Sequence, residues 1–334
     1  MAPVIGPKLT GPKVVVIGGG TGTFTILSAL KYYARDITAI VNMSDDGGST
    51  GILRDELGTL PPGDVRQCLV ALSESDEKMR TLFNYRFDEG TFGGHSFGNI
   101  FLTALEKTTG SFADAVKTAG EILKITGRVV PVTLESVTLV HTNPDKSEVR
   151  GEYILGHYDF KGVTPNLSLD PNPKLNPEAK AAIADADIVV IAPGNLYGSI
   201  APTLIVNGMS KALTETKAKL VYVNNLVTKP GQTDGFKVHD YVREIERFVG
   251  KRKVDYVIFN HKQPTPSLLK KYAQAGEFAV EYDATEKTHY KAIGADLVSD
   301  SIPKLKPSER LIPRTLIRHD SDKLARIIMR IYFS

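Results

Sequence analysis

Short runs of apolar, mainly β-branched residues alternate along this chain with stretches whose apolar residues recur at helical spacing. The runs are typical of buried parallel strands, and the helical stretches are typical of the helices that cover such a sheet. The predicted strands are Val14–Ile17, Ile37–Asn42, Ile188–Ala192, Leu220–Asn224 and Val254–Phe259. The predicted helices are Thr23–Tyr33, Val65–Ser73, Asn99–Lys107, Phe112–Leu123, Val238–Arg247 and Asp322–Tyr332. This alternation predicts an α/β fold with a doubly wound, mostly parallel sheet.

One region departs from the alternation. From residue 128 to about residue 160 the pattern is β-like, with a turn at Asn143-Pro144-Asp145. We expect a small antiparallel β insertion there, within a single domain that spans residues 1–334. Prolines and asparagines recur over residues 161–176. That stretch should form a loop, either a plain connector or a lid.

The strand Val14–Ile17 runs directly into Gly18-Gly19-Gly20-Thr21-Gly22, and a helical pattern follows. This order presents free backbone N–H groups at a helix N-terminus, where phosphate binds. The spacing fits neither the G-x-G-x-x-G fingerprint nor the G-K-[ST] ending of a P-loop, which disfavours an ordinary dehydrogenase or P-loop NTPase. A tight turn without ligand is the alternative, although three successive glycines cost backbone entropy that a plain turn does not need.

Polar residues follow the predicted strands. Because parallel strands of an open sheet end at one rim, and ligands bind outside that rim, we expect these groups to meet there. Asn99 joins them from the polar start of a helix. The candidate nucleotide- or phosphate-binding residues are Gly18, Gly19, Gly20, Thr21, Gly22, Asn42, Asp45, Asp46, Asn99, Gly194, Asn195, Ser199, Asn225 and Thr228.

Three carboxylates add a second chemistry. Asp45 and Asp46 could bind ribose hydroxyls or hold Mg²⁺ through their oxygens, or they could form a solvated turn. Asp64 could be a helix cap, a metal ligand or a general base. Arg54 and Arg66 offer positive charge for phosphate. The histidines form no H-x-x-x-H pair and there is no G-x-S-x-G elbow, which disfavours zinc and serine-hydrolase sites.

Composition narrows the class of protein. The chain is 42% hydrophobic with a net charge of +3 and interspersed charges, which favours a globular protein without a nucleic-acid partner. The single cysteine, Cys68, excludes an intrachain disulfide. No apolar stretch approaches the ~20 residues of a membrane span, and the first residues lack a signal-peptide core. We therefore expect a cytoplasmic protein. Its oligomeric state stays open, a homodimer included.

Taken in order, the motifs resemble the CofD-like family. They are G-G-G-T-G, N-M-S-D-D-G-G-S-T-G, L-P-P-G-D-V-R, H-S-F-G-N, P-G-N-L-Y-G-S-I and G-Q-T-D-G-F, spread over nearly the whole chain. The segments D-D-G-G-S-T-G-I-L-R and I-R-H-D are most similar to the YvcK-like branch, the gluconeogenesis factors. The resemblance implies a Rossmann-like fold.

The resemblance also implies two alternative functions. The YvcK-like branch binds UDP-sugars such as UDP-GlcNAc, and it supports central carbon metabolism, cell shape and cell-wall synthesis. In that case Tyr272 and Arg318 bind the UDP-sugar. The other branch consists of magnesium-dependent 2-phospho-L-lactate transferases with a nucleoside diphosphate-linked donor. In that case Asp64 is the catalytic residue, and Asp45, Asp46 and Asp64 are the candidate magnesium ligands.

Overall fold

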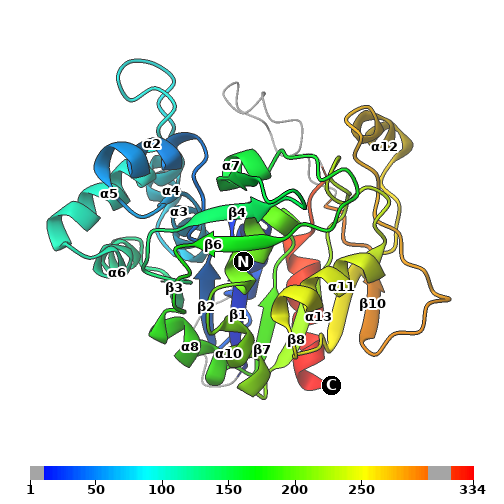
Figure 1. Ribbon diagram of the computed structural model, residues 1–334. Coiled ribbons are helices and arrows are strands. Elements are labelled where there is room, and N and C mark those ends of the chain that lie inside the picture. Colours follow the sequence, from blue (N-terminus) through cyan, green and yellow to red (C-terminus); the bar gives the residue numbers. More distant parts are fainter. Residues whose placement is uncertain (1–10, 300–316) are drawn as a thin grey trace.

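The computed structural model describes residues 11–299 and 317–334, and within them the core is a sheet of seven parallel strands (Figure 1). The spatial order is β10-β9-β8-β7-β1-β2-β3. The chain starts in the middle of the sheet, runs out to β3 and then returns to β7, beside β1. The predicted doubly wound α/β fold is confirmed. The strands are β1 Lys13–Gly18, β2 Asp36–Val41, β3 Arg128–Pro131, β7 Ile188–Ile191, β8 Lys219–Val223, β9 Tyr256–Asn260 and β10 Lys291–Ala295.

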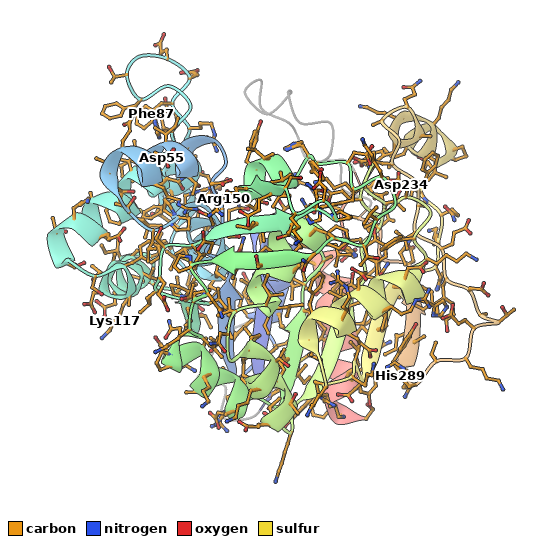
Figure 2. The ribbon with its side chains drawn as sticks, in the orientation of Figure 1. Asp55, Phe87, Lys117, Arg150, Asp234 and His289 are labelled. Carbon is orange, nitrogen blue, oxygen red and sulfur yellow. The ribbon has the colours of Figure 1, made fainter. Side chains whose placement is uncertain are left out.

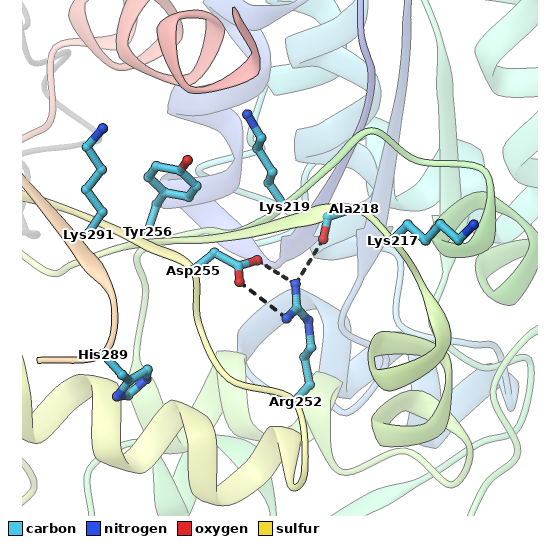
Figure 3. Close-up of a pocket in the computed structure, with 8 residues that line it drawn as sticks. All are labelled: Lys217, Ala218, Lys219, Arg252, Asp255, Tyr256, His289 and Lys291. Atoms are coloured by element: carbon cyan, nitrogen blue, oxygen red, sulfur yellow. Dashed lines mark hydrogen bonds and ion pairs between the residues drawn. The ribbon is translucent and has the colours of Figure 1, made fainter. Parts of the chain in front are cut away.

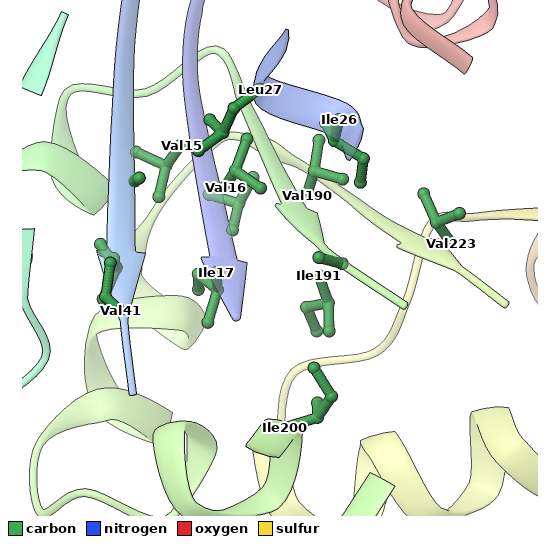
Figure 4. Packing of buried hydrophobic residues seen from close by; sticks show 14 of the residues in the cluster. Val15, Val16, Ile17, Ile26, Leu27, Val41, Val190, Ile191, Ile200 and Val223 are labelled. Carbon is green, nitrogen blue, oxygen red and sulfur yellow. The ribbon is translucent and has the colours of Figure 1, made fainter. Parts of the chain in front are cut away.

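Helices cover both faces of this sheet, so its central strands are apolar on both sides. Every residue of β7 is buried, and Figure 4 shows Val16 and Ile17 of β1 beside Val190 and Ile191 of β7. Helix α1 (Gly20–Leu30) packs between α3 (Gly63–Leu72) and α13 (Ser321–Phe333). On the other face, in front of the sheet in Figure 1, lie α8 (Pro177–Ala184), α10 (Met209–Glu215) and α11 (Val238–Val249).

The remaining helices surround this core. Each of the six predicted helices is present, with ends shifted by a few residues, and the other helices were not predicted. Within the described ranges, no helix combines the length and the apolar character that crossing a bilayer requires. The elements not yet given are α2 Gly48–Leu57, α4 Glu77–Asn84, α5 Phe97–Thr109, α6 Phe112–Ile122, α7 Glu152–Leu155, the π-helical turn η1 Leu196–Ile200, α9 Ala201–Leu204 and α12 Pro266–Ala273.

The antiparallel insertion differs from the prediction at both ends. Strand β3, at the start of the predicted 128–160 insertion, is instead the parallel edge strand of the main sheet, with Arg128 opposite Thr38. The small antiparallel sheet has the order β5-β4-β6, formed by Thr138–Thr142, Glu148–Arg150 and Leu167–Asp170. Strand β6 lies inside the stretch 161–176 that was expected to be a loop. Its two leucines alternate as a strand requires, but the surrounding prolines and asparagines obscured that short pattern.

Candidate functional site

The carboxyl ends of the central strands form one rim, here called the carboxyl rim. Gly18 is paired with Val41 and Ile17 with Ile191, so β1, β2 and β7 end side by side. The strand order reverses between β1 and β7, and ligand crevices of open α/β sheets lie at such switch points. The structure therefore brings together the loops that the sequence placed after β1, β2, β7 and β8.

The glycines of the first loop are needed because other groups approach its backbone. A Cβ atom at Gly22 would lie 1.7 Å from the carbonyl oxygen of Pro193. A Cβ at Gly19 would lie 2.0 Å from Oδ2 of Asp64 and 3.4 Å from Cβ of Asn42. Gly20 has a φ of +64°, in the left-handed region. The loop thus packs closely against β7 on one side and the start of α3 on the other.

The carboxylate of Asp64, a residue in the first turn of α3, lies at the N-terminus of α1. The backbone N–H of Gly20, the first residue of α1, donates a hydrogen bond to the Asp64 carboxylate. Burial, followed by the nearby charge of Asp45, raises the pKa of Asp64 to about 7, against the opposing effects of the Gly20 bond and Arg66. A helix N-terminus attracts anions through its unpaired N–H groups and its dipole. Asp64 therefore occupies part of the place predicted for a ligand phosphate.

Asp45 is directed towards the same place. A Cβ at Gly63, the residue before Asp64, would lie 2.9 Å from Oδ2 of Asp45. The N–H of Gly47 donates to Oδ1 of Asp45 at 3.0 Å, and Arg54 donates to the Asp45 carbonyl oxygen at 2.9 Å. Burial is the main cause that raises the pKa of Asp45 above its ordinary value. Asp45 and Asp64 are thus two neighbouring carboxyl groups that disfavour simultaneous ionisation.

Asp46 points elsewhere. Its carboxylate accepts the backbone N–H groups of Glu152 at 3.0 Å and Tyr153 at 2.7 Å, and so caps the first turn of α7. Among the described residues, no group of three or more His, Cys, Asp or Glu side chains is arranged to hold a metal ion. Asp46 is thus directed towards α7, and a magnesium site formed by all three carboxylates stays a prediction. Asp45 and Asp64 still suit Mg²⁺, which is commonly bound through one or two carboxylates together with substrate phosphates.

Glu152 is a site residue that the sequence analysis missed. A Cβ at Gly198 would lie 2.7 Å from both Oε1 of Glu152 and Nδ2 of Asn195, so these two side chains lie against the same turn. Burial, followed by the charges of Asp45 and Asp64, raises the pKa of Glu152 to about 8. The available signal was Gly151 directly before it, which has a φ of +104°. A glycine before an acidic residue is too common to single out a site.

The second predicted phosphate loop is closed by its own side chains. Asn225 Oδ1 accepts the N–H of Gly194 at 3.1 Å, and its Nδ2 donates to the Gly194 carbonyl at 2.7 Å. Asn195 Oδ1 accepts the N–H of Gly198 at 3.3 Å. Ser199 is half-buried in the same turn. Because the Gly194 and Gly198 amides already have side-chain acceptors, the expectation that this loop offers free N–H groups is wrong for them.

Two further candidate ligand-binding residues, Asn99 and Thr228, form hydrogen bonds inside the protein. The Asn99 amide accepts from Nε of Arg66 at 2.9 Å and donates to Ser49 Oγ at 3.2 Å. The Thr228 hydroxyl accepts the N–H of Phe278 at 3.0 Å. Asn99 and Thr228 are both buried, and their polar atoms are used inside the protein. The structure does not place them as ligand contacts.

The two residues carried over from the resemblance lie close together, although far apart in sequence. The Tyr272 hydroxyl accepts the N–H of Ile317 at 2.9 Å, next to Arg318. Nε2 of His319 lies 3.1 Å from the carbonyl oxygen of Asn224, which places this segment at the end of β8. The Tyr272 side chain is only 5% exposed and offers no open face for a base in this conformation. Arg318 Nε and Asn42 Nδ2 are buried without a hydrogen-bond acceptor among the described residues.

Comparison with known proteins agrees with the family resemblance of the sequence motifs. Residues 14–300 match the model of the family described as "2-phospho-L-lactate transferase CofD". The chain is 38% identical to the "Gluconeogenesis factor" of Listeria innocua, over 95% of each chain. It is 35% identical to the protein of the same name in Bacillus subtilis, covering 95% of this chain and 97% of that one.

A solved structure gives the same result for the fold. A member of the UPF0052 family from Bacillus halodurans superposes with a TM-score of 0.86 at 34% identity, covering 95% of this chain and 99% of that chain. Sequence and fold agree over almost the full length of the chain. This chain therefore belongs to the CofD family, among its gluconeogenesis factors.

Proposed function

We propose that this chain is a cytoplasmic nucleotide-sugar-binding regulator of central carbon metabolism, cell shape and cell-wall synthesis, with a UDP-GlcNAc-type ligand at the carboxyl rim. The observation that carries the proposal is the hydrogen bond from the backbone N–H of Gly20, at the start of α1, to the carboxylate of Asp64. This N–H group already binds one anionic oxygen, that of Asp64, and a phosphate oxygen of the ligand can replace it. The names of the relatives support the metabolic part of the proposal.

Ligand binding at this rim should be linked to proton uptake. A diphosphate entering beside Asp45, Asp64 and Glu152 adds negative charge to carboxyl groups whose pKa values are already raised. Protonation of Asp64 and Glu152 removes the repulsion and turns each into a hydrogen-bond donor. The ligand should therefore bind more tightly below pH 7 than above pH 8.

Arg318 and Asn42 supply donors that favour an anionic ligand. Arg318 Nε and Asn42 Nδ2 are buried donors without an acceptor in the described part of the chain. A buried donor without a partner costs about 1–3 kcal/mol, and a ligand oxygen would remove that cost. Binding would also move the Asp64 carboxylate away from the α1 amide.

A second function is favoured by the neighbouring carboxyl groups of Asp45 and Asp64. Two oxygen ligands beside a diphosphate would suit Mg²⁺, and Asp64 titrates near neutral pH, as a general base should. This is the chemistry of a 2-phospho-L-lactate transferase-like enzyme with a nucleoside diphosphate-linked donor. Magnesium would lower the charge on the transferred group.

Calorimetric titration with UDP-GlcNAc and with GDP, each with and without Mg²⁺, separates the two functions. The regulator should give saturable heat with UDP-GlcNAc that needs no Mg²⁺, and Asp64→Asn should retain binding because it removes a repelling charge. The transferase-like enzyme should prefer Mg²⁺ with GDP and lose that binding in Asp64→Asn. No heat with either nucleotide at millimolar concentration, from folded protein, rejects both functions.

A further inference from the structure

A cavity of about 450 Å³ lies at the amino ends of the strands, where β8, β9 and β10 begin; because of its lysines this place is called the basic edge (Figure 3). Its walls include Lys219, Tyr256 and Lys291, the first residues of these three strands. The carboxyl rim lies at the other end of the same strands. Since β8 has five residues, at about 3.3 Å each, its two ends are roughly 16 Å apart. Asp64 lies beyond the end of β1, two strands further along the sheet, so the two sites do not overlap.

The positive charge of this cavity is not neutralised locally. Lys217, Lys219 and Lys291 have no carboxylate within ion-pair distance among the residues that the structure describes. Arg252 is paired with Asp255, so this pair adds no net charge. Single unpaired lysines also occur elsewhere on the described surface, and only some lysines form ion pairs, as Lys13 does with Asp185 and Lys262 with Asp296. What distinguishes this cavity is that three unpaired lysines line it together. Its one described acidic wall residue, Asp255, is already paired with Arg252.

The cavity is partly preorganised. Nζ of Lys219 donates to the carbonyl oxygen of Ile331 at 2.7 Å, in the last turn of α13. Nζ of Lys219 and Nζ of Lys291 each lie 5.9 Å from the centre of the Tyr256 ring. Lys217 and Lys291 are exposed and can turn towards a ligand. The volume is within the usual range for small-molecule pockets, roughly 300–1,000 Å³.

The chemistry of these groups indicates what the cavity would hold. The guanidinium of Arg252 already donates to Asp255 and, at 3.0 Å, to the carbonyl oxygen of Ala218. Planar bidentate recognition is therefore not available, and lysines act as point charges. Three point charges around one cavity match a compact ligand with several negative charges.

We propose that this cavity binds a compact polyanion, a phosphate compound or a polycarboxylate, at a site separate from the carboxyl rim. Pyrophosphate and citrate serve as the two probes, because they share high charge and differ in chemistry. The intact protein is titrated with each by calorimetry at low ionic strength. If only pyrophosphate binds, the site is specific for phosphate compounds, and if only citrate binds, it is specific for polycarboxylates. If both bind, the site selects its ligand by negative charge alone.

The variant Lys217→Gln/Lys291→Gln should weaken that binding by about tenfold or more. Its matched control is Lys78→Gln/Lys117→Gln, which removes two exposed charges from α4 and α6; Figure 2 shows Lys117 on the opposite side of the molecule from His289, another residue of the cavity wall. The control should keep the affinity within about twofold. The proposal is overturned if neither probe binds, if the cavity variant binds as wild type does, or if both variants weaken binding equally.

Discussion

The two ends of one parallel sheet carry opposite chemistry in this protein. At the carboxyl rim, Asp64 accepts a hydrogen bond from the backbone N–H of Gly20 at the start of α1, and the half-buried residues Asp45 and Glu152 lie nearby. At the other edge, Lys219 donates to the carbonyl oxygens in the last turn of α13. Helices of this fold start near the carboxyl ends of the strands and finish near the amino ends. Their dipoles therefore favour acidic groups and phosphate at one edge and lysines at the other.

The side chains at the carboxyl rim and at the basic edge also differ in burial, and the more buried side chains interact more strongly with the surrounding protein. Burial raises the pKa of Asp64 and Glu152, whereas Lys217 and Lys291 are exposed to solvent. Changes at the carboxyl rim should therefore alter the folding stability of the protein. Changes at the basic edge should alter ligand binding alone.

The largest effect is expected from Gly22→Ala. Its new Cβ would lie 1.7 Å from the backbone carbonyl oxygen of Pro193, which a rotamer change cannot relieve. The free energy of unfolding should fall by about 3 kcal/mol or more, measured by denaturant titration. The control is Gly194→Ala, where the nearest atom is a methyl of Ile200 at 3.2 Å and the cost should be below about 1 kcal/mol. Equal stability of the two variants would show that the loop does not pack as described.

The next effect concerns pH. The raised pKa of Asp64 means that the folded state holds this proton up to about pH 7, while the unfolded state releases it near pH 3.8. The stability that this proton contributes is present below pH 3.8 and is lost as the pH rises towards about 7. Asp64→Asn should lack this loss and be more stable than wild type near neutral pH, on the order of 2 kcal/mol. Parallel stability profiles of the two proteins against pH would contradict it.

A smaller effect is expected from Asp46→Ala. Its carboxylate caps α7 through two backbone N–H groups, and losing such a cap costs about 1 kcal/mol. Hydrogen exchange should become faster at Glu152 and Tyr153 than in the control Asp55→Ala, an exposed position on α2. Unchanged exchange at these two amides would mean that α7 is positioned by other contacts.

The smallest effect should come from the basic edge. Lys217→Gln/Lys291→Gln removes two exposed positive charges that have no carboxylate partner in the described residues, so stability should change by less than about 0.5 kcal/mol. Thermal unfolding with and without salt measures this. A large loss of stability would show that these lysines support the fold and would remove the contrast between the edges.

The sequence predicted the part of the structure that local patterns determine. The β-branched runs located the central strands, and the polar residues after them located the carboxyl rim, because parallel strands must end together. Glu152 was missed because α7 has only four residues and reaches the rim through the antiparallel insertion. The hydrogen bonds of Asn195 and Asn225 to the Gly198 and Gly194 amides could not be predicted, since a side chain that contacts a ligand and one that closes a loop look the same in sequence.

The central claim is that the carboxyl rim takes an anionic nucleotide conjugate in place of the ionised Asp64 carboxylate. Calorimetric titration of the wild type with UDP-GlcNAc, in buffers of different ionisation enthalpy at a pH between the pKa values of Asp64 and Glu152, counts the protons exchanged. The account predicts saturable binding with proton uptake, and that uptake should fall in Asp64→Asn. Binding without proton uptake, or no binding at millimolar ligand, would contradict it.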